Sequence, residues 1–319
     1  MFTKDSRILN NRLTVPLTSV SNAVGDVFKP TLYQLIKSLF ANNEQGFFYD
    51  PNDLSTMFQD ATGTVPVTGV GQAVGLVLDK SKGLSLGSEL NPNITFETLN
   101  GWATGSATTA VIENSEARVT FGGKLASSAN NWFSLLNGAY KVGEVYTVSF
   151  DATYVSGGNL EIGFGYAVDM VVFGNVNVGV KTRYTFTAGG NFNTNALLLF
   201  AASSVGSVWK IDNVSVKKVV GNHSYQTTSS MRPLLVASPQ RIDFDTVGDK
   251  LITNLSAQLT GCTVIRSVPN VGTQILTGQS IPATYEDSTD HCGLLVINRA
   301  LTSNETSAIT AEFNKRAGV

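Results

Sequence analysis

The chain has 319 residues and a formal net charge of −2, and only 14% of its residues are charged, against about a quarter in an average soluble domain. An apolar fraction of 42% excludes a disordered chain, the near-zero net charge argues against a nucleic-acid binder, and no apolar run reaches the roughly 18 residues of a membrane span. The length predicts two or three domains, and the wealth of Thr, Ser, Asn and Gly predicts an uncharged polar surface.

Residues 1–29 show no periodic pattern and predict an extended arm. No secretory signal is expected, because this segment lacks an apolar core followed by a small-residue cleavage site. An amphipathic helix is predicted after Pro30, since apolar residues recur there at helical spacing. Such a stripe needs a surface to cover it, either on its own domain or on a larger assembly, and the sequence leaves both open. The stripe consists of Leu32, Leu35, Ile36, Leu39 and Phe40.

Residues 88–218 carry the clearest pattern, a series of strand-like runs separated by Gly, Asn and Ser. In residues 146–154 apolar and polar side chains alternate, as is typical of a half-buried antiparallel strand. Seven or eight short strands without a helical stripe predict a β-sandwich or jelly roll. The other expected strands cover residues 117–121, 160–164, 170–173, 182–187, 196–200 and 208–217.

The flanking segments predict a second β-rich unit. Residues 74–78 favour a short strand before the sandwich, and residues 241–245, 250–255, 262–268 and 293–298 favour strands after it. The chain then ends in a predicted helix. Thr302 followed by Glu305 forms a capping box, and Ile309 and Phe313 supply the buried stripe of that helix. The expected fold class is therefore mainly β, with a short N-terminal helix and a C-terminal helix.

Residues able to carry chemistry are few. Cys262, Cys292, His223 and His291 are the only cysteines and histidines, and their spacing fits no zinc site. We expect two reduced, semi-buried thiols, with a disulfide as the alternative. No nucleophile, base and orienting group occur at a recognisable spacing, and carboxylates such as Glu161 are equally explained as solvated surface acids. The sequence therefore predicts that the protein is not an enzyme and has no catalytic residues.

Two motifs frame the sandwich. FETLNGW at 96–102 and WKIDNVSV at 209–216 resemble the start and end of jelly-roll carbohydrate-binding modules of bacterial glycan-active and phage proteins, usually "GDFE…GW" and "IDDVSV". Ile94-Thr95 replaces the family's Gly-Asp, and Asn213 replaces the second Asp. The resemblance implies a jelly roll of about 130 residues. It also implies a structural calcium held by Glu97 and Asp212, although calcium needs six to eight oxygens; no other cofactor is expected.

The same resemblance implies a glycan-binding surface. Aromatic rings would stack on sugar rings, with amide groups beside them. Trp102 and Trp209 lie in the motif strands and are expected in the core, which is also the alternative for Trp132. The candidate glycan-binding residues are Trp132, Tyr140, Tyr166, Asn130 and Asn131.

Three further segments, residues 50–60, 74–81 and 293–302, are similar to segments of tailed-phage virion proteins with concanavalin-like or laminin-G-like folds. In those proteins "LDKSG" runs almost directly into "NHA-Q-T-ASRP", whereas here LDKSKG (78–83) and NHSYQTTSSMRP (222–233) are separated by the jelly roll. We therefore predict three parts: an arm and helix at 1–43, a discontinuous β-rich domain of 44–83 plus 219–319, and a jelly roll of 88–218 inserted into it. Such an insertion requires Gly83 and Gly221 to be neighbours.

The resemblance implies a structural component of a tailed-phage virion, assembled in the host cytoplasm and exposed on the particle. A tail-fibre or receptor-binding role in host adhesion is the first expectation. A head-decoration or head-fibre protein is the alternative, and a secreted glycan-binding module or glycosidase accessory protein is an alternative of another class. The implied partners are other virion proteins through residues 1–43, copies of the chain in a trimer or ring, and a host-surface glycan. No nucleic acid and no membrane insertion are expected.

Overall fold

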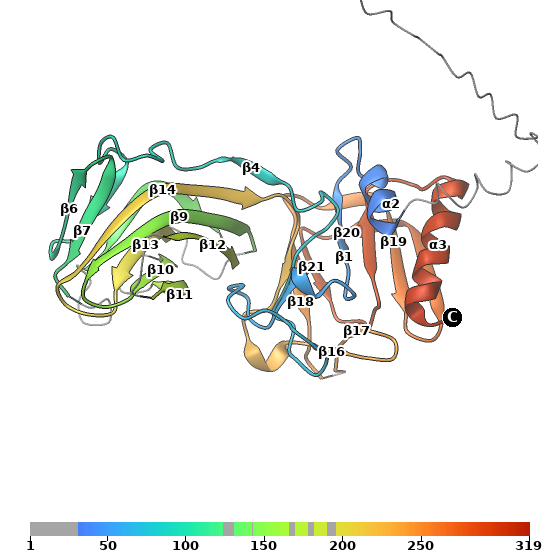
Figure 1. The fold of residues 1–319 in the computed structure, drawn as a ribbon. Helices are drawn as coiled ribbons and strands as arrows, with labels where there is room; N and C mark the ends of the chain where they lie inside the picture. Colours follow the sequence, from blue (N-terminus) through green and yellow to red (C-terminus); the bar gives the residue numbers. More distant parts are fainter. Residues whose placement is uncertain are drawn as a thin grey trace, which may run out of the picture.

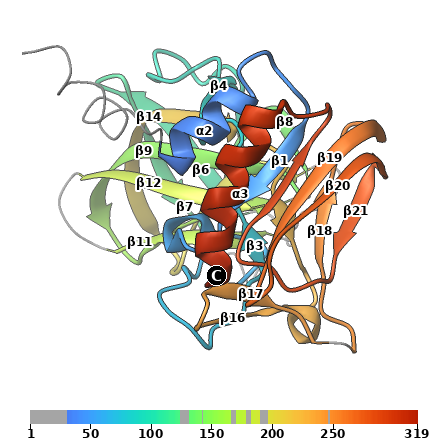
Figure 2. The same cartoon turned by 90° about the vertical axis from the view of Figure 1, so that its right-hand side faces the viewer.

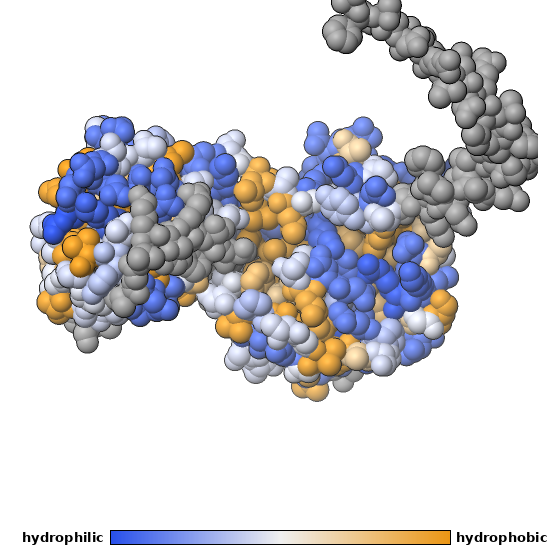
Figure 3. Space-filling model, viewed as in Figure 1, coloured by the Kyte–Doolittle hydropathy of each residue, from blue (hydrophilic) through white to orange (hydrophobic). Residues whose placement is uncertain are grey.

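The computed structural model describes residues 31–123, 131–141, 143–165, 170–177, 182–189, 196–245 and 247–319. Two lobes lie side by side (Figure 1). The sandwich lobe contains strands β4 to β14, and the base lobe contains the elements before and after them. On the face shown in Figure 3, apolar surface gathers at the junction of the lobes and on the lower part of the base lobe. Neither of the described helices is long and apolar enough to cross a membrane.

The sandwich lobe consists of two antiparallel sheets, which confirms the mainly β fold class. Most of the strands predicted for 88–218 are present, with boundaries shifted by a few residues. The five-stranded sheet has the order β11 (Val171–Val176), β10 (Leu160–Gly165), β13 (Ala196–Ala202), β8 (Phe133–Tyr140), β5 (Trp102–Thr104). The second sheet has the order β12 (Thr182–Gly189), β9 (Val145–Ser156), β14 (Ser207–Val219), β7 (Glu116–Phe121), β6 (Thr108–Glu113), with β4 (Leu86–Glu89) paired to β14.

The core of this lobe lies between the two sheets and follows the predicted alternation. Along β9, every second residue from Tyr146 to Ala152 is buried. Trp102 and Trp209, expected in the core, are 6% and 1% exposed. The Trp102 ring stacks on Phe133 with 4.6 Å between centroids, and Trp209 Nε1 donates to the Gly158 carbonyl at 3.0 Å. These rings remove a large apolar area from water, which is the main stabilising contribution in a small sandwich.

The base lobe combines strands from both sides of the sandwich lobe. β1 pairs with β22, and β3 pairs with β15, so each main sheet draws on residues before 84 and after 222. One sheet has the order β1 (Gly46–Tyr49), β22 (Leu294–Ile297), β19 (Leu259–Val268), β20 (Gly272–Ile281). The other has the order β2 (Met57–Phe58), β3 (Leu76–Val77), β15 (Ser224–Tyr225), β18 (Leu251–Asn254), β21 (Thr284–Asp287). β16 (Leu234–Val236) and β17 (Arg241–Asp243) form a separate pair, and two short 3-10 turns are η2 (Leu54–Thr56) and η5 (Ser229–Met231).

Two helices, α2 (Leu32–Leu39) and α3 (Ser303–Ala317), lie together against the first of these sheets (Figure 2). Each begins with a capping box. The Thr302–Glu305 box of α3 is the one predicted, and α2 has a second box formed by Thr31 and Gln34. Gly318 ends α3 in the left-handed conformation that glycine adopts without strain.

The apolar stripe of α2 is buried within its own chain. Leu35, Ile36, Leu39 and Phe40 are at most 7% exposed, and Leu32 is partly buried against them. They pack on Phe48, Ile265, Leu295 and Ile297 of the sheet and on Ile309 and Phe313 of α3. The sequence left open whether the stripe packs on its own domain or on a larger assembly; in the structure it packs on its own domain. The docking or oligomer role predicted for these five residues does not fit this position, because the apolar area they would offer a partner is already removed from water. The predicted arm, residues 1–29, lies outside the described residues.

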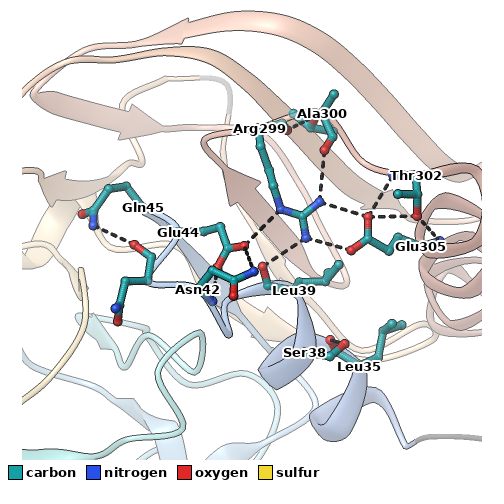
Figure 4. Close-up of polar contacts among 12 residues, drawn as sticks. Leu35, Ser38, Leu39, Asn42, Glu44, Gln45, Arg299, Ala300, Thr302 and Glu305 are labelled. Atoms are coloured by element: carbon teal, nitrogen blue, oxygen red, sulfur yellow. Dashed lines mark hydrogen bonds and ion pairs between the residues drawn. The ribbon is translucent and has the colours of Figure 1, made fainter.

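Arg299 joins the two helices (Figure 4). Its Nη2 donates to the Leu39 carbonyl at the end of α2, and its Nε lies 3.3 Å from the Glu44 carboxylate. Two further hydrogen bonds, of 2.9 and 2.8 Å, reach both carboxylate oxygens of Glu305 in the first turn of α3. This bidentate ion pair, together with the Thr302 capping bonds, lowers the pKa of Glu305 to about 2.

The chain enters and leaves the sandwich lobe at one place. Val220 N donates to the Ser85 carbonyl at 2.8 Å, and Val219 pairs with Leu86 as the last step of the β14–β4 ladder. These contacts bring the neighbours of Gly83 and Gly221 together, the proximity that the insertion hypothesis requires. The division of the chain into domains stays a prediction.

A buried carboxylate holds this crossing point. Asp79 is fully buried, and its oxygens accept hydrogen bonds from the backbone N–H groups of Phe48, Ser81 and Asn222 and from the Ser81 hydroxyl, at 2.8 to 2.9 Å. Asp79 N donates to Nδ1 of His223, whose Nε2 lies 3.1 Å from the Val219 carbonyl. Burial lowers the pKa of His223 to about 4, so the ring is neutral at pH 7 and Nε2 is the donor.

Candidate binding face

The outer face of the five-stranded sheet is the side turned away from the sandwich core. Core residues such as Phe133, Leu198 and Phe164 alternate with residues that point to this side. The strand register places one residue from each strand in a row across the whole sheet. This middle row consists of Ala103, Ser134, Leu199, Gly163 and Val172.

A second row lies beside the middle row and contains the polar and aromatic side chains. Ala201, Glu161 and Asn175 are in register on β13, β10 and β11. Trp132 directly precedes β8, and because Phe133 points into the core, Trp132 points to the outer face and continues the row next to Ala201. We call these four residues the rim row. Neighbouring strands lie about 4.8 Å apart, so the four residues of the row span roughly 14 Å.

The two rows differ in their access to solvent. Ser134 and Leu199 of the middle row are at most 1% exposed, although they point away from the core. At Gly163 the Met170 side chain passes over the sheet, so close that a Cβ there would lie 2.8 Å from Met170 Cε. The middle row is therefore closed at its centre, while Ala103 and Val172 at its two ends are half-buried. In the rim row, Ala201 is fully buried, Trp132 and Glu161 are half-buried, and Asn175 is exposed.

The rim row has the chemistry of a site for a neutral, hydroxyl-rich ligand. An indole ring can stack on a sugar ring, a carboxylate accepts hydrogen bonds, and an amide both donates and accepts them. Asn159 and Asn177 extend the polar end of the row, with a hydrogen bond of 3.1 Å between their side chains. A ligand along this row would be recognised by stacking and hydrogen bonding, because Glu161 is the only charged residue in the row.

Of the five glycan-binding residues predicted from the sequence, Trp132 fits this surface. Tyr140 is 1% exposed, and its ring packs 4.2 Å from that of Phe164 in the core, so it has no free face for a sugar. Asn131 is 2% exposed and equally inaccessible. Asn130 and Tyr166 lie outside the described residues.

The predicted calcium ligands both lie in the sandwich lobe, Glu97 between β4 and β5 and Asp212 within β14. Glu97 is exposed and accepts a hydrogen bond from the Ser115 hydroxyl at 3.3 Å. Asp212 is half-buried on β14 and lies opposite Asp151 of β9. Within the part of the chain that the structure describes, no group of three or more His, Cys, Asp or Glu side chains is placed to hold a metal ion. A structural calcium at Glu97 and Asp212 stays a prediction.

The two cysteines are buried and free, as the sequence predicted. Burial raises the pKa of both thiols, which makes them poor nucleophiles at neutral pH. Cys292 follows His291, and both side chains are fully buried, with His291 Nε2 2.9 Å from Oδ2 of Asp287.

No protein-family model matches the chain, and no curated protein matches it. Similar solved structures include an arabinose-bound GH51 α-L-arabinofuranosidase, at 13% identity and a TM-score of 0.34, over 43% of this chain and 27% of that one. A CBM4 structure has 15% identity and a TM-score of 0.32, over 40% of this chain and 99% of that one. The CBM22-1 xylan-binding domain of Paenibacillus barcinonensis Xyn10C has 16% identity and a TM-score of 0.33, over 42% and 97%. Carbohydrate-binding modules are thus among its structural neighbours.

Proposed function

We propose that the chain is a non-catalytic structural protein of a tailed-phage virion that displays a glycan-binding β-sandwich, with the rim row as its contact surface. The observation that carries this proposal is the strand register, which aligns the partly exposed Trp132, Glu161 and Asn175 beside a middle row that is closed at its centre. The ligand is a neutral saccharide bound by stacking and hydrogen bonding. A tail-fibre or receptor-binding role follows from such a surface.

The virion context is supported by the sequence resemblance of the base lobe. Two of the segments that resemble tailed-phage virion proteins are far apart in the sequence but adjacent in space. Leu76 pairs with Tyr225, and Asp79 contacts both Asn222 and His223. The base lobe would be the particle-side support, and the sandwich lobe would face outward.

Glycan binding is tested by screening the full chain on a glycan array and by titration calorimetry with the best neutral saccharide. Trp132→Ala should lower the affinity at least tenfold, about 1.4 kcal/mol, and Glu161→Gln should lower it less. Tyr33→Ala, at a half-exposed aromatic residue of the base lobe, and Glu312→Gln on α3 are matched controls that should bind like the wild type. Unchanged binding by Trp132→Ala would overturn the assignment of the rim row.

The virion role is tested separately, with an antibody against the chain and purified particles. Labelling on the outside of particles supports the proposal, and its absence from them contradicts it. If particles are labelled but no saccharide binds, the head-decoration alternative replaces the receptor-binding role.

A further inference from the structure

A cavity of about 450 Å³ lies in the base lobe, at the place where the chain crosses to the sandwich lobe. Its walls are the C-terminal end of α2, residues from the segment 81–85 before β4, and Val220 after β14. The volume falls within the roughly 300 to 1,000 Å³ that is typical of small-molecule sites. The cavity contains no residue of the rim row, so it is separate from the surface proposed above.

The charge of its lining distinguishes this cavity from others in the molecule. The described residues that line it include Lys37 and Lys82 but no aspartate or glutamate. Three other cavities place carboxylates beside their lysines, from Asp50 in one, Asp53 in another, and Asp245, Asp249 and Glu286 in the third. Within the described chain, Lys37 and Lys82 form no ion pair, whereas Lys80 and Lys218 do. Two uncompensated positive charges therefore face this cavity in a chain whose net charge is −2.

Two contacts hold the ammonium group of Lys82 in position. Its Nζ donates to the Glu44 carbonyl at 2.7 Å and lies 5.2 Å from the centre of the Phe40 ring. An ammonium group has three N–H donors, so two remain for a ligand. Because the side chain is already ordered, an anion that binds here costs little side-chain entropy.

The neighbouring carboxylates are engaged elsewhere. Asp79 is fully buried and accepts the hydrogen bond of the Ser81 hydroxyl at 2.9 Å. The Glu44 carboxylate accepts a hydrogen bond from Asn42 N at 2.8 Å and lies 3.3 Å from Nε of Arg299. Neither acid lines the cavity, so an anion that enters it meets the two lysines first.

Small polar side chains complete the lining and indicate the rest of the ligand. The exposed amide of Asn43 and hydroxyl of Ser85 can each donate and accept hydrogen bonds, and the Ser81 oxygen can still accept one. Such groups complement sugar hydroxyls, and ammonium groups complement a carboxylate. A small inorganic anion would leave most of the cavity unfilled, and a neutral sugar would leave both lysines without a counter-charge.

We propose that this cavity binds an acidic saccharide, a sugar that carries a carboxylate. Lys37 and Lys82 bind the carboxylate, and Asn43, Ser81 and Ser85 bind the hydroxyl groups. The chain then has a second saccharide site, in the base lobe, whose ligand differs in charge from the neutral ligand of the rim row. Because the two sites share no residue, failure of this proposal leaves the proposed function of the rim row standing.

Titration of the full chain with three probes at low salt tests the ligand class. D-glucuronate has both the sugar ring and the carboxylate, D-glucose has only the ring, and acetate has only the carboxylate. Followed by NMR chemical shifts, glucuronate should bind at least tenfold more tightly than either of the others, because it alone uses the lysines and the hydroxyl-binding groups together. Acetate that binds as tightly as glucuronate would show adventitious anion binding only and would overturn the proposal, as would glucose that binds equally well.

Variants of the lining test the position of the site. Lys37→Gln and Lys82→Gln should each weaken glucuronate binding about fivefold, because each removes a charge-assisted hydrogen bond in a partly solvated site. Ser85→Tyr keeps both lysines but fills the cavity, and it should abolish binding. Lys315→Gln is the matched control, since Lys315 of α3, like Lys37 of α2, is an exposed lysine in the last turn of a helix, and it should bind like the wild type.

The thermal midpoint of each variant shows whether it is folded, and Lys37 and Ser85 are exposed, so their replacement should leave it unchanged. Glucuronate binding that persists in Ser85→Tyr, or that falls as much in Lys315→Gln as in Lys37→Gln, contradicts the inference.

Discussion

The carboxylate of Asp79 accepts a hydrogen bond from the backbone of Asn222 at 2.8 Å, although the two residues are 143 positions apart. The whole sandwich lobe lies between them in the sequence. The contact therefore fixes the point at which the chain leaves the base lobe and returns to it, and it does so with a fully buried ionisable group.

Replacing Asp79 by Asn should destabilise the protein by about 2 to 4 kcal/mol. The amide nitrogen cannot accept the hydrogen bonds that one carboxylate oxygen now receives, so buried donors lose their partner. The free energy of unfolding from denaturant titration measures the effect. Asp245→Asn is the control: Asp245 also accepts backbone hydrogen bonds, from residues 247 to 249, but it is exposed, and its replacement should have a much smaller effect.

The stability difference between the wild type and Asp79→Asn should depend on pH, because the pKa of Asp79 is shifted in the folded protein. Burial raises the pKa of Asp79 to about 6, against about 4 in an unfolded chain. The folded protein thus binds this proton more tightly, and the group's contribution to stability is complete below pH 4 and lost as the pH rises from 4 to 6. The stability advantage of the wild type over Asp79→Asn should therefore grow by up to about 3 kcal/mol from pH 7 to pH 4. An advantage that shrinks on acidification contradicts this prediction.

Glu305→Gln should cost about 1 kcal/mol at pH 7. Glutamine keeps the hydrogen bonds of the capping box but loses the bidentate ion pair with Arg299, which is partly screened by solvent. Because the pKa of Glu305 is lowered to about 2, its stabilising contribution is present above pH 4 and is lost as the pH falls toward 2. Thermal unfolding at pH 7 and pH 2.5 should show this convergence, while Glu312→Gln, two turns further along α3, should change little at either pH.

Arg266→Leu should be among the most destabilising single changes in the base lobe. Arg266 Nη2 lies 2.9 Å from Oδ1 of Asp287, whose side chain is 2% exposed and whose Oδ2 lies 2.9 Å from His291 Nε2. The substitution removes the arginine partner of this buried carboxylate, at a cost of about 3 to 5 kcal/mol. The double variant with Asp287→Leu should recover part of the loss. Lys250→Leu breaks an exposed ion pair with Glu286 of the same length and should cost less than 1 kcal/mol. Similar losses of stability in Arg266→Leu and Lys250→Leu would show that burial does not determine how much each ion pair contributes.

Gly46→Ala should prevent folding or lower stability by more than 3 kcal/mol. Gly46 has φ +138°, and a Cβ there would overlap the Val296 carbonyl on the paired strand β22. Gly69→Ala is the matched control, because nothing lies within 4 Å of its Cβ position and its φ is ordinary. Expression and the thermal midpoint of the two variants measure the difference.

Sequence patterns predicted the elements whose two faces differ in burial. The alternation in residues 146–154 predicted β9, because burial on one side imposes a period on the residues. The Thr302–Glu305 box predicted the start of α3, because its side chains bond the N–H groups that the first helical turn leaves free. β20 was not predicted. It lies at the edge of its sheet and is only partly buried on the face toward α3, at Thr273 and Ile275, so its apolar alternation is weak.

The candidate site was predictable in only one residue. Trp132 was singled out as an aromatic residue, but its neighbours in the rim row come from strands 29 or more residues away, and their alignment depends on strand register. Tyr140 is an aromatic residue of the same segment, yet it points into the core, because β8 contains a register irregularity that a single sequence does not reveal. The residue types thus indicated which side chains could stack on a sugar, but the strand register determines which of them are exposed to solvent.

The hydrogen bond between Val220 and Ser85 holds the two ends of the sandwich lobe side by side. A chain cut at these two residues and rejoined by a single turn would leave the sheets of the base lobe with all their strands. Removal of the sandwich lobe would, however, expose the apolar cluster that its Val145 and Val219 form with Leu76, Leu78 and Tyr225, so any replacement lobe must cover the same base-lobe residues.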